Sequence, residues 1–418
     1  MKVPGSDSAP LRHSMKKTIF LCALFCAAAA VVAAAQQNPS QEPATQPAEV
    51  QPQVWPPPPG SEPQPAPAEP PHAAPVQPPA LSARAAENAE EDLPEGRIRL
   101  NVIVTDKSGK PVAGLAQRDF TLFDNNREMP IAGFRAHSGA MTFPVQVILI
   151  IDAVNVGFQS VSYSRYGIDT FLRKDGGRLA APVSIYWYTD QGLEGQGPEG
   201  QPAEMTDGNA LAAQLDATES RLRLLNRSAG AWGAIERFEM SVQMMDRIAH
   251  IEARSPGRKL IVWIGPGWPL LDNPNMQMSW KQQQNLFRSI VSMSTLLREG
   301  QVEICSASQG MPDPYTYLYQ GYTKGVKKAS QAFLPDLNLK VLAVESGGQV
   351  LPPSNDLAAE IDRCMQDAGA YYTIGFDPPP ADGPDEYHAL SVKVDKPGLT
   401  ARTDTGYYNQ PPARTQVP

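Results

Sequence analysis

The stretch at residues 144–156, PVQVILIIDAVNV, constrains the fold more than any other part of the chain. It is almost wholly apolar over residues 145–151, and this run ends at Asp152. An uninterrupted apolar run of this length is typical of a parallel strand that is buried on both faces. Ligands bind at the carboxyl ends of the strands in open α/β sheets. We therefore expect Asp152 to lie at the ligand-binding edge of a parallel sheet.

Further strand candidates alternate with segments of helical period. The strand candidates are residues 183–188, 260–264, 302–304 and 349–351, and the helical segments are residues 232–248, 280–298 and 356–368. In the first helical segment, Trp232, Ile235, Val242, Met245 and Ile248 form one apolar stripe. Strands that alternate with helices predict a mostly parallel sheet with helices on both faces.

Short strands without helices flank this α/β unit on both sides. They are predicted at residues 97–104, 120–123 and 131–134 before it, and at 371–376, 387–394 and 400–408 after it. The first group is too short for an independent sandwich. We therefore expect the two groups to form one discontinuous β module.

The first third of the chain contains a leader and a linker. Lys16 and Lys17 precede an apolar, alanine-rich run that ends at Ala35, as in a secretory signal that is cleaved near Gln36; an uncleaved membrane anchor is the alternative. Translation starts at Met1 or Met15. Residues 39–79 hold 16 of the 42 prolines, which predicts an extended linker. We expect an extracytoplasmic protein, in the periplasm, in the cell envelope or secreted, with no membrane span after cleavage.

The charge and the cysteine content limit which classes of partner and which redox compartment the sequence predicts. The formal net charge is -8 and no basic patch favours nucleic acid. Cys22 and Cys26 lie in the leader, which leaves Cys305 and Cys364 for the folded part. We expect two separate buried thiols. A disulfide between them is the alternative if the protein is in an oxidising compartment.

Four segments in this order resemble a von Willebrand factor type A (VWA) domain of secreted acidobacterial proteins. They are the strand that ends at Asp152, LIVWIGPGWPLL at 260–271, VESGGQVL at 344–351 and YYTIGFDPPP at 371–380. The resemblance implies a VWA-type sheet inserted in, or flanked by, a small β-sandwich-like module. The expected division is a signal peptide at 1–35, a linker at 36–94, an N-terminal β module at 97–142, a VWA-like domain at 144–369, C-terminal β strands at 371–408 and a tail at 409–418.

The resemblance also implies a divalent-cation site, and this chain departs from its pattern. VWA domains hold the cation with an Asp-x-Ser-x-Ser motif, a threonine and a second aspartate. Asp152 matches the first position, but Val154 and Val156 replace the serines and offer no oxygen. Gly265 or Pro266 stands in place of the second aspartate.

These replacements predict a site that does not function and a protein without a cofactor. Around Ala231, where the threonine is expected, the chain has SAGAWGA. Asn155 and Asp190 are auxiliary ligands for weak Mg²⁺ or Mn²⁺ binding if the fold brings them to Asp152. Without a cation, we expect Asp152 to accept hydrogen bonds from backbone amides of the turn at residues 155–158.

No catalytic motif stands out, and the five histidines are scattered. We therefore predict a non-enzymatic adhesion or interaction module that binds a protein or glycan. One alternative is a metal-dependent adhesion domain, which titration with Mg²⁺ or Mn²⁺ would distinguish. The other is an unrecognised hydrolase whose catalytic groups only the fold brings together.

Overall fold

The computed structural model describes residues 97–138, 145–195, 204–218, 230–272, 278–311 and 316–411. The predicted signal segment and proline-rich linker lie outside the described residues, and so do residues 412–418 of the predicted tail. Within the described ranges, no helix is both long and apolar enough to cross a membrane.

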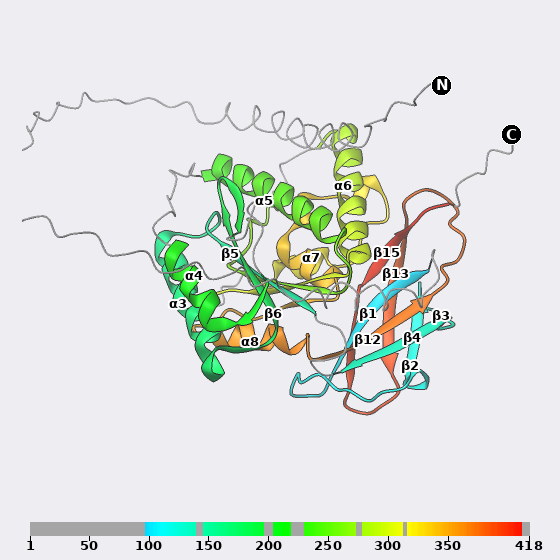
Figure 1. Ribbon diagram of the computed structural model, residues 1–418. Coiled ribbons are helices and arrows are strands. Elements are labelled where there is room, and N and C mark those ends of the chain that lie inside the picture. Colours follow the sequence, from blue (N-terminus) through cyan, green and yellow to red (C-terminus); the bar gives the residue numbers. More distant parts are fainter. Residues whose placement is uncertain are drawn as a thin grey trace, which may run out of the picture.

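A mostly parallel sheet lies at the centre of the larger part of the molecule (Figure 1). Its strands lie in the order β11 (Gln349–Val350), β10 (Val302–Ala307), β9 (Lys259–Ile264), β5 (Gln146–Asp152), β6 (Arg178–Thr189) and β7 (Gly192–Gly195), and β8 (Met205–Asp207) also pairs with β6. Only β7 and β8 run antiparallel to their neighbour. The apolar run before Asp152 forms β5, which is buried between β9 and β6 as the sequence predicts.

Helices cover both faces of this sheet (Figure 1). One face carries α5 (Gly230–Glu252), α6 (Trp280–Glu299) and α7 (Leu339–Glu345), and the other carries α3 (Phe158–Arg173), α4 (Gly208–Thr218) and α8 (Leu357–Gln366). Side chains of β5 alternate between the two layers, because successive residues of a strand point to opposite faces. Ile148 and Ile150 pack in the α5–α7 layer, whereas Val147, Leu149 and Ile151 pack in the α3–α8 layer.

The strands at the two ends of the described chain form a β sandwich of two antiparallel sheets. One sheet has the order β14 (Thr400–Arg402), β1 (Ile98–Thr105), β12 (Ala370–Phe376) and β4 (Gly133–Ser138); the other has β15 (Gly406–Asn409), β13 (Glu386–Val394), β2 (Phe120–Asp124) and β3 (Arg127–Met129). Residues of both sheets, such as Leu100, Ile374, Leu122 and Tyr407, share one apolar core.

N-terminal strands pair with C-terminal strands in both sheets of this sandwich. β1 pairs with β12 and β14, and β2 pairs with β13. The predicted fold class is confirmed: a mostly parallel α/β sheet with helices on both faces, and a β module built from both ends of the chain. The sequence did not predict α3, α4, α7, β3, β7 or β8. Short 3₁₀ helices η2 (Gln117–Asp119), η3 (Lys174–Gly177), η6 (Leu318–Tyr322), η7 (Ala329–Gln331) and η8 (Leu334–Leu337) complete the described elements.

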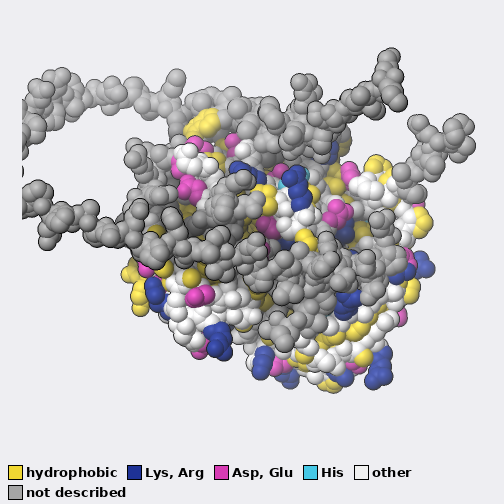
Figure 2. Space-filling model, viewed as in Figure 1, with side chains coloured by type: hydrophobic (Ala, Val, Ile, Leu, Met, Phe, Trp, Pro, Cys, Tyr) yellow, Lys and Arg dark blue, Asp and Glu magenta, His cyan; other side chains and the backbone are white. Residues whose placement is uncertain are grey.

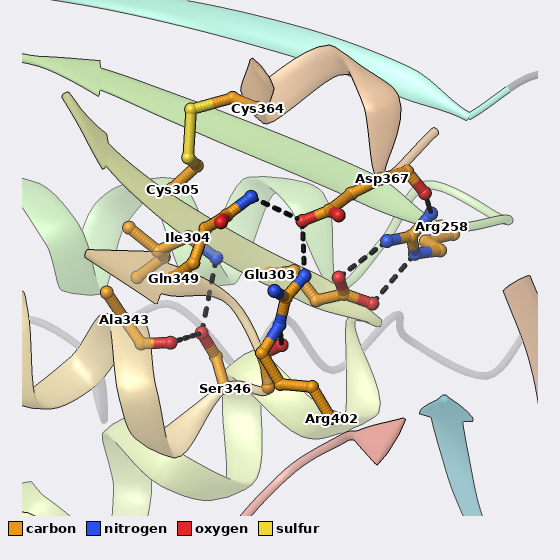
Figure 3. Close-up of polar contacts among 11 residues, drawn as sticks. Arg258, Glu303, Ile304, Cys305, Ala343, Ser346, Gln349, Cys364, Asp367 and Arg402 are labelled. Atoms are coloured by element: carbon orange, nitrogen blue, oxygen red, sulfur yellow. Dashed lines mark hydrogen bonds and ion pairs between the residues drawn. A yellow bond between two sulfur atoms is a disulfide. The ribbon is translucent and has the colours of Figure 1, made fainter. Parts of the chain in front are cut away.

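Buried charges join the sandwich to the amino-terminal edge of the parallel sheet (Figure 3). The fully buried guanidinium of Arg258 donates to both carboxylate oxygens of Glu303 (2.7 and 2.5 Å) and to the backbone oxygen of Asp367 (2.8 Å). Arg402 of β14 forms an ion pair with Asp367 and donates to the Gly347 oxygen at 2.8 Å. A buried ion pair is retained at low cost only when its remaining hydrogen-bonding groups are satisfied, as they are in this cluster. These contacts fix the sandwich against the α/β part.

One sequence prediction is wrong at this junction. Cys305 and Cys364 form a disulfide, not two separate thiols. Cys305 lies in β10 and Cys364 in α8, which packs on that strand, so the tertiary fold brings together two residues 59 positions apart. Nothing in the local sequence around either cysteine indicates this proximity.

Candidate functional site

The carboxyl edge of the parallel sheet is the candidate site. β5, β6, β9 and β10 all end there, because they run parallel. α3 begins just after β5, at this edge. α5 leads into β9 and α6 leads into β10, and both strands start at the opposite edge, so both helices begin at the carboxyl edge. Asp152, the last residue of β5, lies at the centre of this edge with only 1% of its surface exposed.

Two backbone amides hold one oxygen of the Asp152 carboxylate. The amides of Val154 and Asn155 donate to Oδ1 at 3.0 and 2.9 Å. An aspartate that accepts from amides two and three residues ahead stabilises a tight turn, here the turn between β5 and α3. The sequence predicted amide donors from residues 155–158. The structure shows Asn155, which lies in that range, and Val154, which lies one residue before it.

The Asn155 side chain adds a third donor group and extends the network. Its amide nitrogen lies 3.2 Å from Oδ1 and 2.9 Å from Oδ2 of Asp152. The same nitrogen lies 3.2 Å from the Ser241 hydroxyl of α5, which is 3.0 Å from the Tyr188 hydroxyl of β6. β5 with the turn after it, α5 and β6 therefore share one buried polar network.

Trp263 supplies the fourth donor group, and sequence reasoning missed it. Its indole N–H donates to Asp152 Oδ2 at 3.2 Å, and the ring is fully buried in β9. Tyr188 and Trp268 pack edge-on against this ring at centroid distances of 5.7 and 5.4 Å. A buried indole N–H needs an acceptor. A tryptophan inside an apolar strand was therefore the signal in the sequence that could have indicated a hydrogen bond to a buried acceptor such as Asp152.

Gly265 lets the loop after β9 pass directly over Asp152. Its φ of +145° lies in a region that favours glycine, and a Cβ at this position would lie 2.8 Å from the Asp152 Cβ. The loop is fixed further along, where the Trp268 indole donates to the Leu337 oxygen at 2.9 Å and Asn338 donates to the Trp268 oxygen at 3.0 Å. The loop therefore covers the carboxylate.

Burial and hydrogen bonding act on the Asp152 pKa in opposite directions. Burial raises this pKa above its ordinary value, while hydrogen bonds from Asn155, Val154 and Trp263 oppose the rise by stabilising the carboxylate. Burial is the larger effect, so the net direction is upward.

The residues at this edge do not fit a divalent cation. Both carboxylate oxygens already accept hydrogen bonds from N–H groups, which cannot be metal ligands. The two valines in the serine positions contribute to apolar packing instead: Val154 in the α5–α7 layer and Val156 in the α3–α8 layer. In the described part of the chain, no group of three or more His, Cys, Asp or Glu side chains is placed to hold a metal ion.

The two predicted auxiliary ligands have different positions. The fold brings Asn155 to Asp152, but its nitrogen faces the carboxylate, and its buried side-chain oxygen lacks a hydrogen-bond partner among the described residues. Asp190 lies beyond the end of β6, where it accepts a hydrogen bond from Gln191 at 3.3 Å. A single amide oxygen cannot complete the six to eight oxygen ligands, or the octahedral shell, that hard cations require.

Large apolar side chains are exposed around the same edge. Trp232 near the start of α5 is 40% exposed, and Trp280 at the start of α6 is 59% exposed. Met311, which follows β10, is 87% exposed. Contiguous apolar surface on a folded protein is typical of an interaction site, whereas single exposed residues are ordinary. These three residues lie at the ends of neighbouring elements.

Comparisons with known proteins give only distant likenesses. The chain matches no protein-family model and no curated protein. Among solved structures it is similar to manganese-loaded TRAP protein of Plasmodium vivax, with 9% identity, a TM-score of 0.28, and coverage of 65% of this chain and 96% of that one. It is also similar to the human COPII-coat protein Sec24c, with 9% identity, a TM-score of 0.30, and coverage of 64% and 44%. Scores this low establish neither a family nor a function.

Proposed function

We propose that this chain is an exported, non-enzymatic interaction module of VWA type, which binds a protein or glycan at the carboxyl edge without a metal ion. One observation carries the proposal: four donor groups occupy the Asp152 carboxylate at the position where such a module would hold its cation. A partner must then be recognised by the surface itself. The exposed apolar side chains at this edge are available for that role.

The disulfide supports export. Cys305 and Cys364 are both fully buried, so the bond belongs to the folded core and not to an exposed redox centre. Structural disulfides persist in oxidising compartments and are rare in the cytosol of mesophiles. This agrees with the predicted signal segment, whose cleavage mass spectrometry of the native protein would test.

The proposal is tested by capture from an envelope extract of the source organism. Immobilised wild-type chain is compared with the double variant Trp280→Ser/Met311→Ser, in the presence of EDTA or of millimolar Mg²⁺. The control is Tyr163→Ser/Tyr166→Ser, which removes two exposed aromatic side chains from α3. We expect a partner that the control retains, that the edge variant loses, and that EDTA does not release.

Two results would favour the alternatives. Release by EDTA would favour a metal-dependent adhesion domain. Turnover of generic ester, glycoside or peptide substrates by the purified chain would favour a hydrolase. Equal capture by both double variants would show that the carboxyl edge is not the binding surface.

A further inference from the structure

A basic ridge lies beside α6 on this acidic protein. The ridge consists of Lys324, Lys327 and Lys328, which are all exposed and lie between η6 and η7 (Figure 1, yellow). Among the residues that the structure describes, none of the three forms an ion pair or a hydrogen bond. Three cations within five residues, none of them paired with a described residue, form a local positive charge in a chain whose net charge is -8.

The backbone under the ridge is held in place. Val326 is buried, and its carbonyl oxygen accepts a hydrogen bond from the Tyr408 hydroxyl at 2.9 Å. Gly325, with φ +69°, packs so closely on the Tyr387 ring that a Cβ would lie 2.0 Å from the ring carbon Cζ. The lysines therefore project from a fixed turn on the sandwich, and not from a loose loop. Fixed positions lower the entropy cost of binding.

Acidic groups also lie near the ridge. Asp272 accepts a hydrogen bond from the hydroxyl of Tyr322, two residues before Lys324, and Glu345 and Asp336 act on Tyr408. Burial raises the pKa of Asp336 to about 7 and that of Glu345 to about 8, which reduces the negative charge that these two groups carry near neutral pH.

Arg288 of α6 follows Phe287, whose ring packs on Tyr408, and among the described residues its guanidinium donates to the neutral Asn285 side chain and the Gln284 oxygen. Two further acids precede Tyr387 in the chain, and both accept hydrogen bonds from neutral amide groups. Asp385 accepts from Gln410 at 2.6 Å, and Glu386 accepts from the Asp382 amide at 2.7 Å.

An exposed aromatic side chain lies close to the ridge in the chain. Phe333, two residues after the end of η7, is 52% exposed, while η7 itself packs on α6. Cations with a neighbouring aromatic group suit a partner that is both anionic and partly apolar. Lysine is a compact point charge that imposes no planar geometry, so a flexible acidic chain fits it well.

We propose that the ridge binds an acidic peptide segment of a partner protein, with Phe333 as the apolar contact. The whole molecule is negative, which disfavours approach to an anionic membrane, whereas a short peptide senses mainly the charges within a Debye length of about 8 Å. The inference rests on the proposed role as an interaction module. The ridge is a different surface from the carboxyl edge, so the experiment on one surface can contradict its proposal and leave the proposal for the other surface unaffected.

The test uses the full chain and a fluorescent peptide of alternating glutamate and leucine residues, measured by anisotropy. The variant is Lys324→Gln/Lys327→Gln/Lys328→Gln. The control, Lys107→Gln/Lys110→Gln/Lys393→Gln, removes the same charge from exposed sites elsewhere on the sandwich. We expect the ridge variant to weaken binding by about tenfold and the control by less than about twofold. Phe333→Ser should weaken binding without changing its salt dependence.

Three results would overturn the proposal. The first is no binding of the peptide at low salt. The second is an equal loss in both triple variants, which would show an effect of net charge alone. The third is lysine-dependent binding to vesicles that contain phosphatidylglycerol together with no binding of the peptide, which would assign the ridge to a membrane surface.

Discussion

Replacement of Asp152 by alanine should destabilise the fold far more than loss of an exposed cap. The change leaves the N–H groups of Val154 and Trp263 buried without an acceptor, and each such group costs about 1–3 kcal/mol. Removal of a buried charge offsets part of that cost. We expect a net loss of roughly 2–4 kcal/mol in the free energy of unfolding, above the roughly 0.5–2 kcal/mol of a simple cap.

Asparagine at this position separates the roles of the two carboxylate oxygens. In Asp152→Asn, one oxygen still accepts the turn amides, but the new NH₂ group then meets the Trp263 N–H. Either orientation of the amide sets one donor against another. Trp263→Phe removes one of the two donors that meet this NH₂ group, the other being the Asn155 side-chain nitrogen, so the double variant should be more stable than the sum of the two single losses implies.

The assay is urea unfolding of the full chain, with EDTA or with millimolar Mg²⁺ or Mn²⁺. We expect the same unfolding midpoint for the wild type in all three conditions, because both carboxylate oxygens are already hydrogen-bonded. A ligand that binds only the folded state raises stability by mass action. A midpoint that rises with the cation in the wild type, and not in Asp152→Ala, would refute the reasoning.

Three further perturbations test other parts of the structure. Burial raises the pKa of Glu360 to about 8, so the folded state holds a proton that the unfolded chain releases. The free energy of unfolding should therefore fall as pH rises from about 4.5 to 8. Glu360→Gln should reduce this pH dependence, measured as urea midpoints across the same range. Reduction of the Cys305–Cys364 disulfide, which closes a separation of 59 residues, should cost roughly 2–4 kcal/mol and lower the Tm, whereas dithiothreitol should not change the Tm of Cys305→Ser/Cys364→Ser. Gly265→Ala should lose roughly 2 kcal/mol or more in urea unfolding, because its Cβ meets Asp152, and a stability equal to the wild type would contradict the described loop path.

The sequence predicted the parts of the fold that local patterns encode. β5 was predictable because its burial on both faces requires a continuous apolar run. The sandwich built from both chain ends was predictable because neither strand group can bury its apolar face alone. α3 was missed because Tyr163 and Tyr166 lie on its exposed face, and this obscures the apolar stripe.

The candidate site was predicted only in part, for a physical reason. The turn amides on Asp152 depend on residues two and three positions away, which a sequence pattern can represent. Trp263 is 111 residues from Asp152, and only the pairing of β5 with β9 brings the two together. The partner of Cys305 was out of reach for the same reason, because α8 must first pack on β10.

The insertion of the α/β part between β4 and β12 determines how the protein would carry mechanical load. Both ends of the described chain, Arg97 and Pro411, adjoin the sandwich, and both connections to the α/β part leave from it. A pull between the two ends therefore acts first on the strand pairs that hold β1 and β15. The parallel sheet lies off that path. Its carboxyl edge can keep its shape under a tension that the sandwich resists.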